Sequence, residues 1–275
     1  ATDEWIELYN TTNSPVSMAG WTLAADDGTP SIQLAGTIGA LSYFLLERTA
    51  DTTISNVSAD QIYTGALGNE GEYLRLSDSS NTLVDAVDAS AGWMSGDNAT
   101  KQSMERVSAS QGGSKASNWA KNNIIQHNGK DAGVAIVYGT PGNWINGTPK
   151  QANSTVTSPT TIADGTLRFD EFSTLTLTTL GSPYVATVSI IIPAGKTLIV
   201  EPGVQVKFQD NAGYLTVQGT LKAQGTQTSG ITLTVTDLGA VWCGVRIIAP
   251  STASQLDYVT IDKAQSLTGG GGCNQ

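Results

Sequence analysis

The stretch that most constrains the fold is residues 189–208, SIIIPAGKTLIVEPGVQVKF, in which short apolar runs alternate with tight turns. The β-branched residues 190–192 suit a pleated, buried strand. A Pro-Ala-Gly sequence then turns the chain, because Pro fixes φ and Gly tolerates a positive φ. The run at 198–200 ends in a similar Glu-Pro-Gly turn. Short strands joined by tight corners, without a helical period between them, predict a coiled β-solenoid.

Further motifs of this kind follow along residues 186–264: GYLTVQGTLKAQGT, ITLTV, WCGVRI and LDYVTIDKA. Taken in this order with the first stretch, they resemble the first coils of right-handed parallel β-helix domains on secreted bacterial proteins. The resemblance implies parallel strands that stack coil on coil. Because only about three coils are predicted, we expect a truncated solenoid.

The N-terminal half shows a different pattern, with short strands about 8–15 residues apart and no helical period. Residues 4–10, EWIELYN, alternate Trp5 and Tyr9 with Ile6 and Leu8, which is the periodicity of a strand with two different faces. Residues 43–47 are nearly continuously apolar and suit a central strand. Other predicted strands lie near residues 16–23, 32–34, 61–63, 73–76, 83–87 and 103–107. This spacing predicts an antiparallel β-sandwich.

Eight motifs occur in a fixed order between residues 3 and 146: EWIELYN, GWTL, YFLLER, EYLRL, VDAVD, SMERV, NWA and GTPGN. In this order they resemble the lamin-tail domain as it occurs in bacterial secreted proteins. The resemblance implies an immunoglobulin-like β-sandwich over residues 1–146. The expected fold class is therefore all-β, with an immunoglobulin-like sandwich of the lamin-tail type followed by a truncated right-handed parallel β-helix.

Composition divides the rest of the chain. Residues 147–165 are poor in apolar side chains and rich in Thr, Ser and Pro, which predicts a linker. Residues 166–264 are expected to form a cap and the first coils, because a stack of coils needs an end that covers its open edge and apolar interior. Residues 265–275 are rich in Gly and predict a flexible end.

The charge of the chain limits its partners. There are 14 Lys and Arg against 24 Asp and Glu, a net charge of −10. Without a basic run, the chain lacks the electrostatic attraction that drives binding to nucleic acid or anionic membranes. We therefore expect no nucleic-acid partner, and the absence of a run of about 18 apolar residues predicts no membrane insertion. Open sheet or solenoid edges predict self-association.

Catalytic residues are not expected. His127 is the single histidine, and no G-x-S-x-G nucleophile motif accompanies it. One histidine and the two distant cysteines, Cys243 and Cys273, do not supply four zinc ligands. We interpret Cys243 as a small buried apolar residue within a strand. The charges at Asp257 and Asp262 are interpreted as solvated, so we expect no enzyme activity.

Two sets of residues are candidate binding sites. Trp93 lies among turn residues without a strand pattern, and an exposed indole suits the apolar face of a sugar; with Asp97 and Asn98 it forms the candidate ligand site. Calcium takes oxygen ligands from flexible loops, and the candidate ligands are Asp26, Asp27, Asp85 and Asp88. Their spacing matches no calcium-binding repeat, so these residues are alternatively plain turn residues. We expect no other cofactor.

The chain begins at Ala1 without an initiator Met, and we expect it to be a fragment of a larger protein. We interpret it as a non-catalytic module of a secreted or cell-surface bacterial protein, with a sandwich for adhesion or anchoring carried on a β-helix. The expected partner is a protein or an extracellular polysaccharide. Two alternatives stay open: part of a carbohydrate-active β-helix lyase or glycoside hydrolase with catalytic coils beyond residue 275, or an accessory domain of a secreted nuclease or phosphatase.

Overall fold

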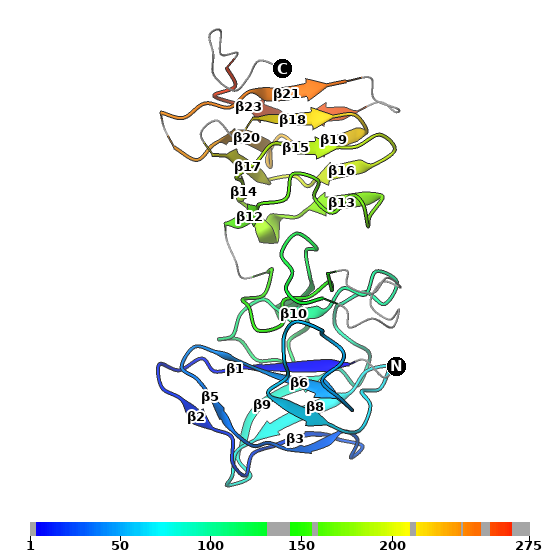
Figure 1. Cartoon of the computed structure of the whole chain (residues 1–275), viewed down its shortest axis with the longest axis vertical. Coiled ribbons are helices and arrows are strands. Elements are labelled where there is room, and N and C mark those ends of the chain that lie inside the picture. The colour runs from blue at the N-terminus through cyan, green and yellow to red at the C-terminus, as the bar shows by residue number, and fades with distance from the viewer. Residues whose placement is uncertain are drawn as a thin grey trace. The chain divides into compact units, whose positions relative to one another are not determined.

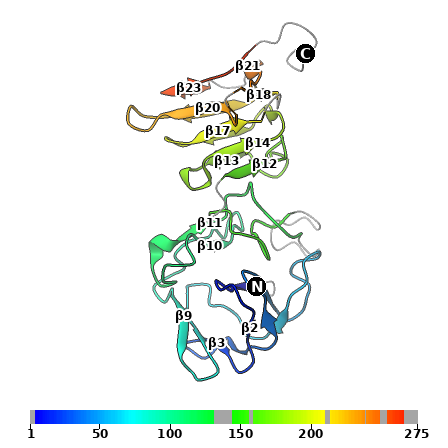
Figure 2. The same ribbon diagram turned by 90° about the vertical axis from the view of Figure 1, so that its left-hand side faces the viewer.

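The structure is a computed structural model that describes residues 4–130, 144–155, 159–209, 213–237, 239–248 and 254–265. The chain forms two compact units, Ala1–Val156 (unit 1) and Thr157–Gln275 (unit 2), which differ in colour in Figures 1 and 2. Apart from the short 3-10 turns η1 (Ala116–Asn118) and η2 (Thr179–Gly181), the regular elements of the described residues are strands. The all-β prediction is confirmed. Within the described part, none of the helices has the length and apolar content needed to cross a bilayer.

Unit 1 contains two main sheets. One has the strand order β1-β6-β7 and the other β4-β3-β8-β9. Their bounds are β1 (Trp5–Tyr9), β3 (Thr22–Ala25), β4 (Ser31–Gln33), β6 (Tyr43–Arg48), β7 (Gln61–Tyr63), β8 (Tyr73–Ser77) and β9 (Leu83–Asp88). Two shorter strands, β2 (Val16–Ser17) and β5 (Thr37–Ile38), pair antiparallel with each other.

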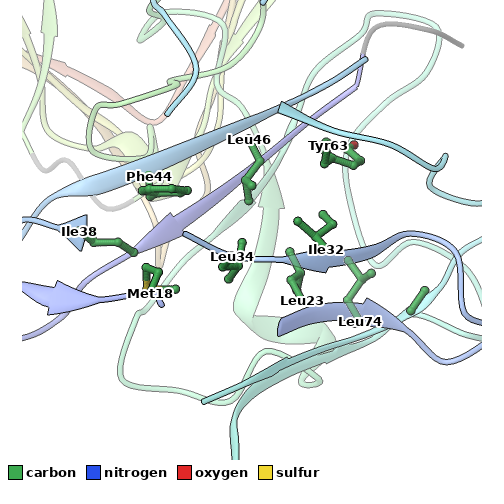
Figure 3. Packing of buried hydrophobic residues seen from close by; sticks show 10 residues of the cluster. Met18, Leu23, Ile32, Leu34, Ile38, Phe44, Leu46, Tyr63 and Leu74 are labelled. Atoms are coloured by element: carbon green, nitrogen blue, oxygen red, sulfur yellow. The ribbon is translucent and has the colours of Figure 1, made fainter. Parts of the chain in front are cut away.

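The sandwich core lies between these two sheets. Side chains alternate along a strand, so Ile6 and Leu8 of β1 face the core together with Phe44 and Leu46 of β6. Figure 3 shows Leu46 pointing into the space between the sheets, toward Leu34 and Leu23, and Phe44 lying near Ile38 and Met18. The buried members of the core are Met18, Leu23, Ala25, Ile32, Leu34, Ile38, Phe44, Leu46, Tyr63 and Leu74. The alternation read from EWIELYN is confirmed.

One pairing in the sandwich is parallel. Strand β7 runs parallel to β6, so the sandwich is mixed and this pair differs from the antiparallel prediction. Parallel neighbours need a long crossover, which residues 49–60 provide without a strand or helix of their own. Glu47, which is fully buried, accepts hydrogen bonds from the backbone N–H groups of Thr53 and Ile54 at 2.9 and 3.2 Å. Its carboxyl therefore holds the crossover in place.

The outer face of the β1-β6 sheet is also covered. Residues 144–155, here called the anchor segment, bring Ile145 against Leu45 and Trp5. The approach is close: a Cβ atom at Gly147 would lie 2.8 Å from Cζ2 of Trp5. The hairpin of β10 (Met104–Arg106) and β11 (Trp119–Lys121) bonds to the same segment, because the N–H of Ser103 donates to the carbonyl of Asn146 at 2.8 Å. Residues 147–155, within the predicted linker, thus pack in unit 1.

Unit 2 is a three-sided β-solenoid whose strand pairings are all parallel. The first sheet contains β12 (Thr160–Ile162), β14 (Tyr184–Ala186), β17 (Gln205–Phe208), β20 (Ile231–Val235) and β23 (Val259–Ile261). The second contains β13 (Thr174–Leu177), β16 (Thr197–Val200), β19 (Thr220–Gln224) and β22 (Gln255–Asp257). The third contains β15 (Ile190–Ile192), β18 (Tyr214–Val217) and β21 (Gly244–Ile247). Figure 2 shows β14, β17, β20 and β23 in succession, and the predicted solenoid is confirmed at about four turns.

The solenoid interior is a stack of apolar side chains in register. Leu175, Leu198 and Leu221 lie opposite one another on successive strands and are at most 2% exposed. The rings of Phe208 and Trp242 stack with centroids 4.1 Å apart and planes 7° apart.

In the last described coil, the side chains that continue the inward rows are 38–50% exposed: Ile247, Leu256 and Ile261.

Candidate functional site

The most unusual side chain of the β1-β6 sheet is Glu7. It follows the alternation of Trp5 and Tyr9 and so faces away from the sandwich core, opposite Leu45 on β6. The backbone N–H of Lys150, in the anchor segment, donates a hydrogen bond to Oε2 of Glu7. A carboxyl of the first strand thus binds a backbone group near the end of unit 1.

A second carboxyl, Glu105 on β10, lies in the same region and is 3% exposed. Its Oε1 accepts hydrogen bonds from Nδ2 of Asn122 at 2.7 Å and from the hydroxyl of Thr148 at 2.9 Å. Its Oε2 accepts two more from Ser154, from the backbone N–H at 2.9 Å and from the hydroxyl at 2.6 Å. The hydroxyl of Ser103 also donates to Oε1 at 3.4 Å, so both oxygens are engaged, and two of the four partner residues belong to the anchor segment.

An ion pair completes the cluster. The ammonium group of Lys150 lies 2.9 Å from Oδ1 of Asp60, whose other oxygen accepts the N–H of Leu45 at 2.7 Å. Lys150 has a φ of 56°, a left-handed conformation that is uncommon for residues other than Gly. This backbone geometry accompanies an N–H directed to Glu7 and a side chain directed to Asp60. We call Glu7, Asp60, Glu105 and Lys150 the carboxylate cluster.

Burial decides the protonation of the cluster. Desolvation of its carboxyl is the main cause that raises the pKa of Glu7 from the ordinary 4.5 to about 8; the charges of Glu105 and Asp60 act in the same direction, and the backbone N–H and the charge of Lys150 oppose the shift. Burial also raises the pKa of Glu105, while its hydrogen bonds from Ser154, Asn122 and Thr148 act in the opposite direction. Glu7 therefore keeps its proton through the neutral range. Glu105 accepts more hydrogen bonds from the protein than Glu7 does.

Sequence reasoning missed this cluster. One signal was present, because Glu7 interrupts the aromatic face of EWIELYN and so places a carboxyl on a face that is otherwise apolar. Its partners could not be identified, since Lys150 is 143 residues away along the chain. Only the fold brings them together.

The candidate ligand residues have structural contacts. Trp93 is half-buried against the sandwich core, and its indole N–H donates to the carbonyl of Gly68 at 2.8 Å. Asp97 closes a turn by accepting the N–H groups of Ala99 and Thr100, which lowers its pKa. Asn98 is exposed and accepts a hydrogen bond from the ammonium group of Lys101. Of the three, Asn98 presents the most accessible polar group, and the ligand site stays a prediction.

The four candidate calcium ligands are each engaged. Asp26 pairs with Arg75 at 2.8 Å, and Asp27 accepts the N–H of Thr29 at 2.9 Å. Asp85 and Asp88 lie on β9, where Asp85 forms a bidentate pair with Arg106 at 2.6 and 3.0 Å.

Asp88 binds the N–H and hydroxyl of Ser90, which lowers its pKa. In the described parts of the chain, no group of three or more His, Cys, Asp or Glu side chains is placed to hold a metal ion. Calcium binding stays a prediction.

The structure corrects one interpretation. Cys243 precedes β21, is half-buried and forms a disulfide, so it is not the isolated apolar strand residue that was expected. The other cysteine of the chain, Cys273, lies outside the described residues. The local sequence could not indicate this, because spacing between two cysteines carries no information on their distance in the fold.

Comparison with known proteins finds a similarity within unit 1. Residues 1–91 match the family model of the Lamin Tail Domain. Searches of curated proteins and of solved structures returned no match. The matched residues contain strands β1 to β9, and therefore both main sheets of the sandwich.

Proposed function

We propose that this lamin-tail domain and the β-solenoid after it form a non-catalytic module of a secreted or cell-surface protein, in which the sandwich binds a partner and the solenoid presents it. The observation that carries the proposal is the use made of buried carboxyls. Glu47 and Glu105 are at most 3% exposed and accept hydrogen bonds from the chain itself, so they hold segments in place. A catalytic carboxyl needs access to a substrate.

The architecture of unit 2 supports a structural role. Each coil contacts its neighbours through parallel ladders and in-register apolar stacks. Such stacks behave as quasi-one-dimensional elements and suit presentation of another domain.

Two properties support a location outside the cell. Cys243 forms a disulfide, and disulfides persist in oxidising compartments. The net charge of −10 disfavours nucleic acid and anionic membranes as partners. A protein or an extracellular polysaccharide is the partner class that remains.

Binding assays test the proposal. The purified chain is passed over arrays of extracellular polysaccharides and matrix proteins, and we expect saturable binding to at least one of them. Asn98→Ala is expected to weaken this binding about 5–10-fold, corresponding to the loss of one or two hydrogen bonds. Asn13→Ala, at another exposed turn, is the matched control and is expected to bind like the unmodified chain.

A catalytic assay separates the proposal from the enzyme alternative. The same polysaccharides are incubated with the chain and assayed for new reducing ends and unsaturated uronates. We expect none above the buffer level. Product formation would instead favour a carbohydrate-active β-helix.

A further inference from the structure

We propose that attachment of the anchor segment to the sandwich is controlled by a proton: the segment is held tightly while Glu7 is neutral, and it loosens when Glu7 and Glu105 are both ionised. The inference concerns unit 1 alone and does not depend on the proposed binding function. It assigns a role to Glu7 and Lys150 of the carboxylate cluster, which the proposed function does not use.

The contacts of the anchor segment are concentrated on these two carboxyls. Glu7 receives the N–H of Lys150, while Glu105 receives the hydroxyl of Thr148 and two groups of Ser154. Thr148 and Ser154 are at most 2% exposed. One stretch of seven residues, 148–154, therefore covers both acids, and lifting it would expose both to water.

The charged and titratable groups around Glu7 come from four parts of unit 1. Glu105 belongs to β10, Asp60 precedes β7, Lys150 lies in the anchor segment and Tyr43 belongs to β6. Of these groups one, Lys150, is cationic, and its ammonium group is bonded to Asp60 at 2.9 Å. A second negative charge, on Glu7, would thus face Glu105 with its nearest cation already paired.

The direction in which pH changes the attachment of the anchor segment follows from the raised pKa of Glu7. Glu7 has a pKa of about 8 in the folded chain, against an ordinary 4.5 once it is exposed to water. Between pH 4.5 and pH 8, Glu7 is protonated when the anchor segment is attached and ionised when the segment is released. Attachment is therefore strongest below about pH 4.5, weakens as the pH rises toward 8, and changes little above that through this group.

Hydrogen exchange of the whole chain, read by mass spectrometry, tests the proposal. Exchange is measured at pH 6 and pH 9 and corrected for the intrinsic effect of pH. We expect protection of the amides of residues 144–155 to fall at least 10-fold between these pH values. Protection of β3 and β8, in the opposite sheet, is expected to stay constant.

Glu7→Gln is the decisive variant, because glutamine keeps a side-chain oxygen for the N–H of Lys150 but carries no charge. We expect its anchor segment to remain equally protected at both pH values. Glu70→Gln, at an exposed glutamate, is the matched control and should respond to pH like the unmodified chain. An equal fall in protection in Glu7→Gln would overturn the proposal.

The unmodified chain alone provides a test that does not depend on the folding of a variant. The fall in protection is followed in steps of half a pH unit from 6 to 10.5. Protection that falls up to about pH 8 and is level above it supports control by Glu7. Constant protection, or a midpoint above pH 10 where Lys and Tyr titrate, contradicts it.

Discussion

Units 1 and 2 supply hydrogen-bond partners to their backbone N–H and C=O groups in different ways. In the solenoid, a strand such as β19 pairs on one edge with β16 and on the other with β22, so the ladder itself supplies the hydrogen bonds. In the sandwich, long irregular connections rely on buried side chains. Asn118 is an example: it is 1% exposed, and its Nδ2 group donates to the carbonyls of Ser108, Gln111 and Gly112 at 3.0–3.3 Å.

This difference indicates which kind of change lowers the stability of each unit. A backbone ladder does not titrate, so the described coils depend mainly on apolar packing. Side chains that replace a ladder include carboxyls such as Glu47 and Glu105, whose burial raises their pKa values. The stability of unit 1 is therefore expected to depend on pH and that of unit 2 on the volume of its interior side chains.

The largest effect is expected from breaking the solenoid stack. Phe208→Ala removes a ring that is fully buried against Trp242, and should lower the free energy of unfolding of unit 2 by about 3–5 kcal/mol. Calorimetry of the full chain would show the transition of unit 2 moving to a lower temperature, with that of unit 1 unchanged. Ile191→Ala, at a residue of the same unit that is 40% exposed, should cost less than about 1 kcal/mol. Similar losses for both variants would contradict the stack.

A smaller effect in unit 1 should follow from Glu105→Ala. The change leaves the buried groups of Asn122, Thr148 and Ser154 without their acceptor, so we expect a loss of about 3 kcal/mol from the stability of unit 1. Urea denaturation, followed by the fluorescence of the tryptophans of unit 1, measures it. Glu70→Ala is the exposed control and should change stability by less than about 0.5 kcal/mol. A loss below 1 kcal/mol for Glu105→Ala would mean that its hydrogen bonds are replaced by water.

The smallest of the three effects is steric. In Gly147→Ala, the new Cβ would lie 2.8 Å from Cζ2 of Trp5 and 3.0 Å from Oγ of Ser103, so the anchor segment must shift away from the sheet. We expect a loss of about 1–3 kcal/mol, by the overpacking of a close contact. Gly112→Ala meets nothing within 4 Å and serves as the control in the same denaturation experiment. Equal stability of the two variants would contradict the close approach of Gly147 to Trp5.

Much of the fold could be predicted because its cause is local. The two faces of β1 follow from the alternation of Trp5, Ile6 and Leu8, and the corners of the solenoid follow from the Pro and Gly residues between short apolar runs. These signals act over two to four residues, as the side-chain period of a strand and the length of a turn require. The parallel pairing of β7 has no such signal, since the crossover of residues 49–60 has no regular structure that a pattern could reveal.

The candidate site was less accessible to sequence reasoning. Trp93 was predicted to be exposed because turn residues surround it, but contact with the sandwich core and with the carbonyl of Gly68 depends on residues from other strands. The same holds for Asp85, whose carboxylate pairs with Arg106, 21 residues further along the chain. Local sequence indicates which residues can bind a ligand, but not which have already found a partner within the chain.

The sequence by itself determined the class of each unit, because strand alternation and turn chemistry are properties of neighbouring residues. It also placed a carboxyl, Glu7, on an otherwise aromatic face. Tertiary structure decided what that carboxyl does. Desolvation and the approach of Glu105, Asp60 and Lys150 depend on segments up to 143 residues apart, and a pKa depends on distance in space and not on distance along the chain.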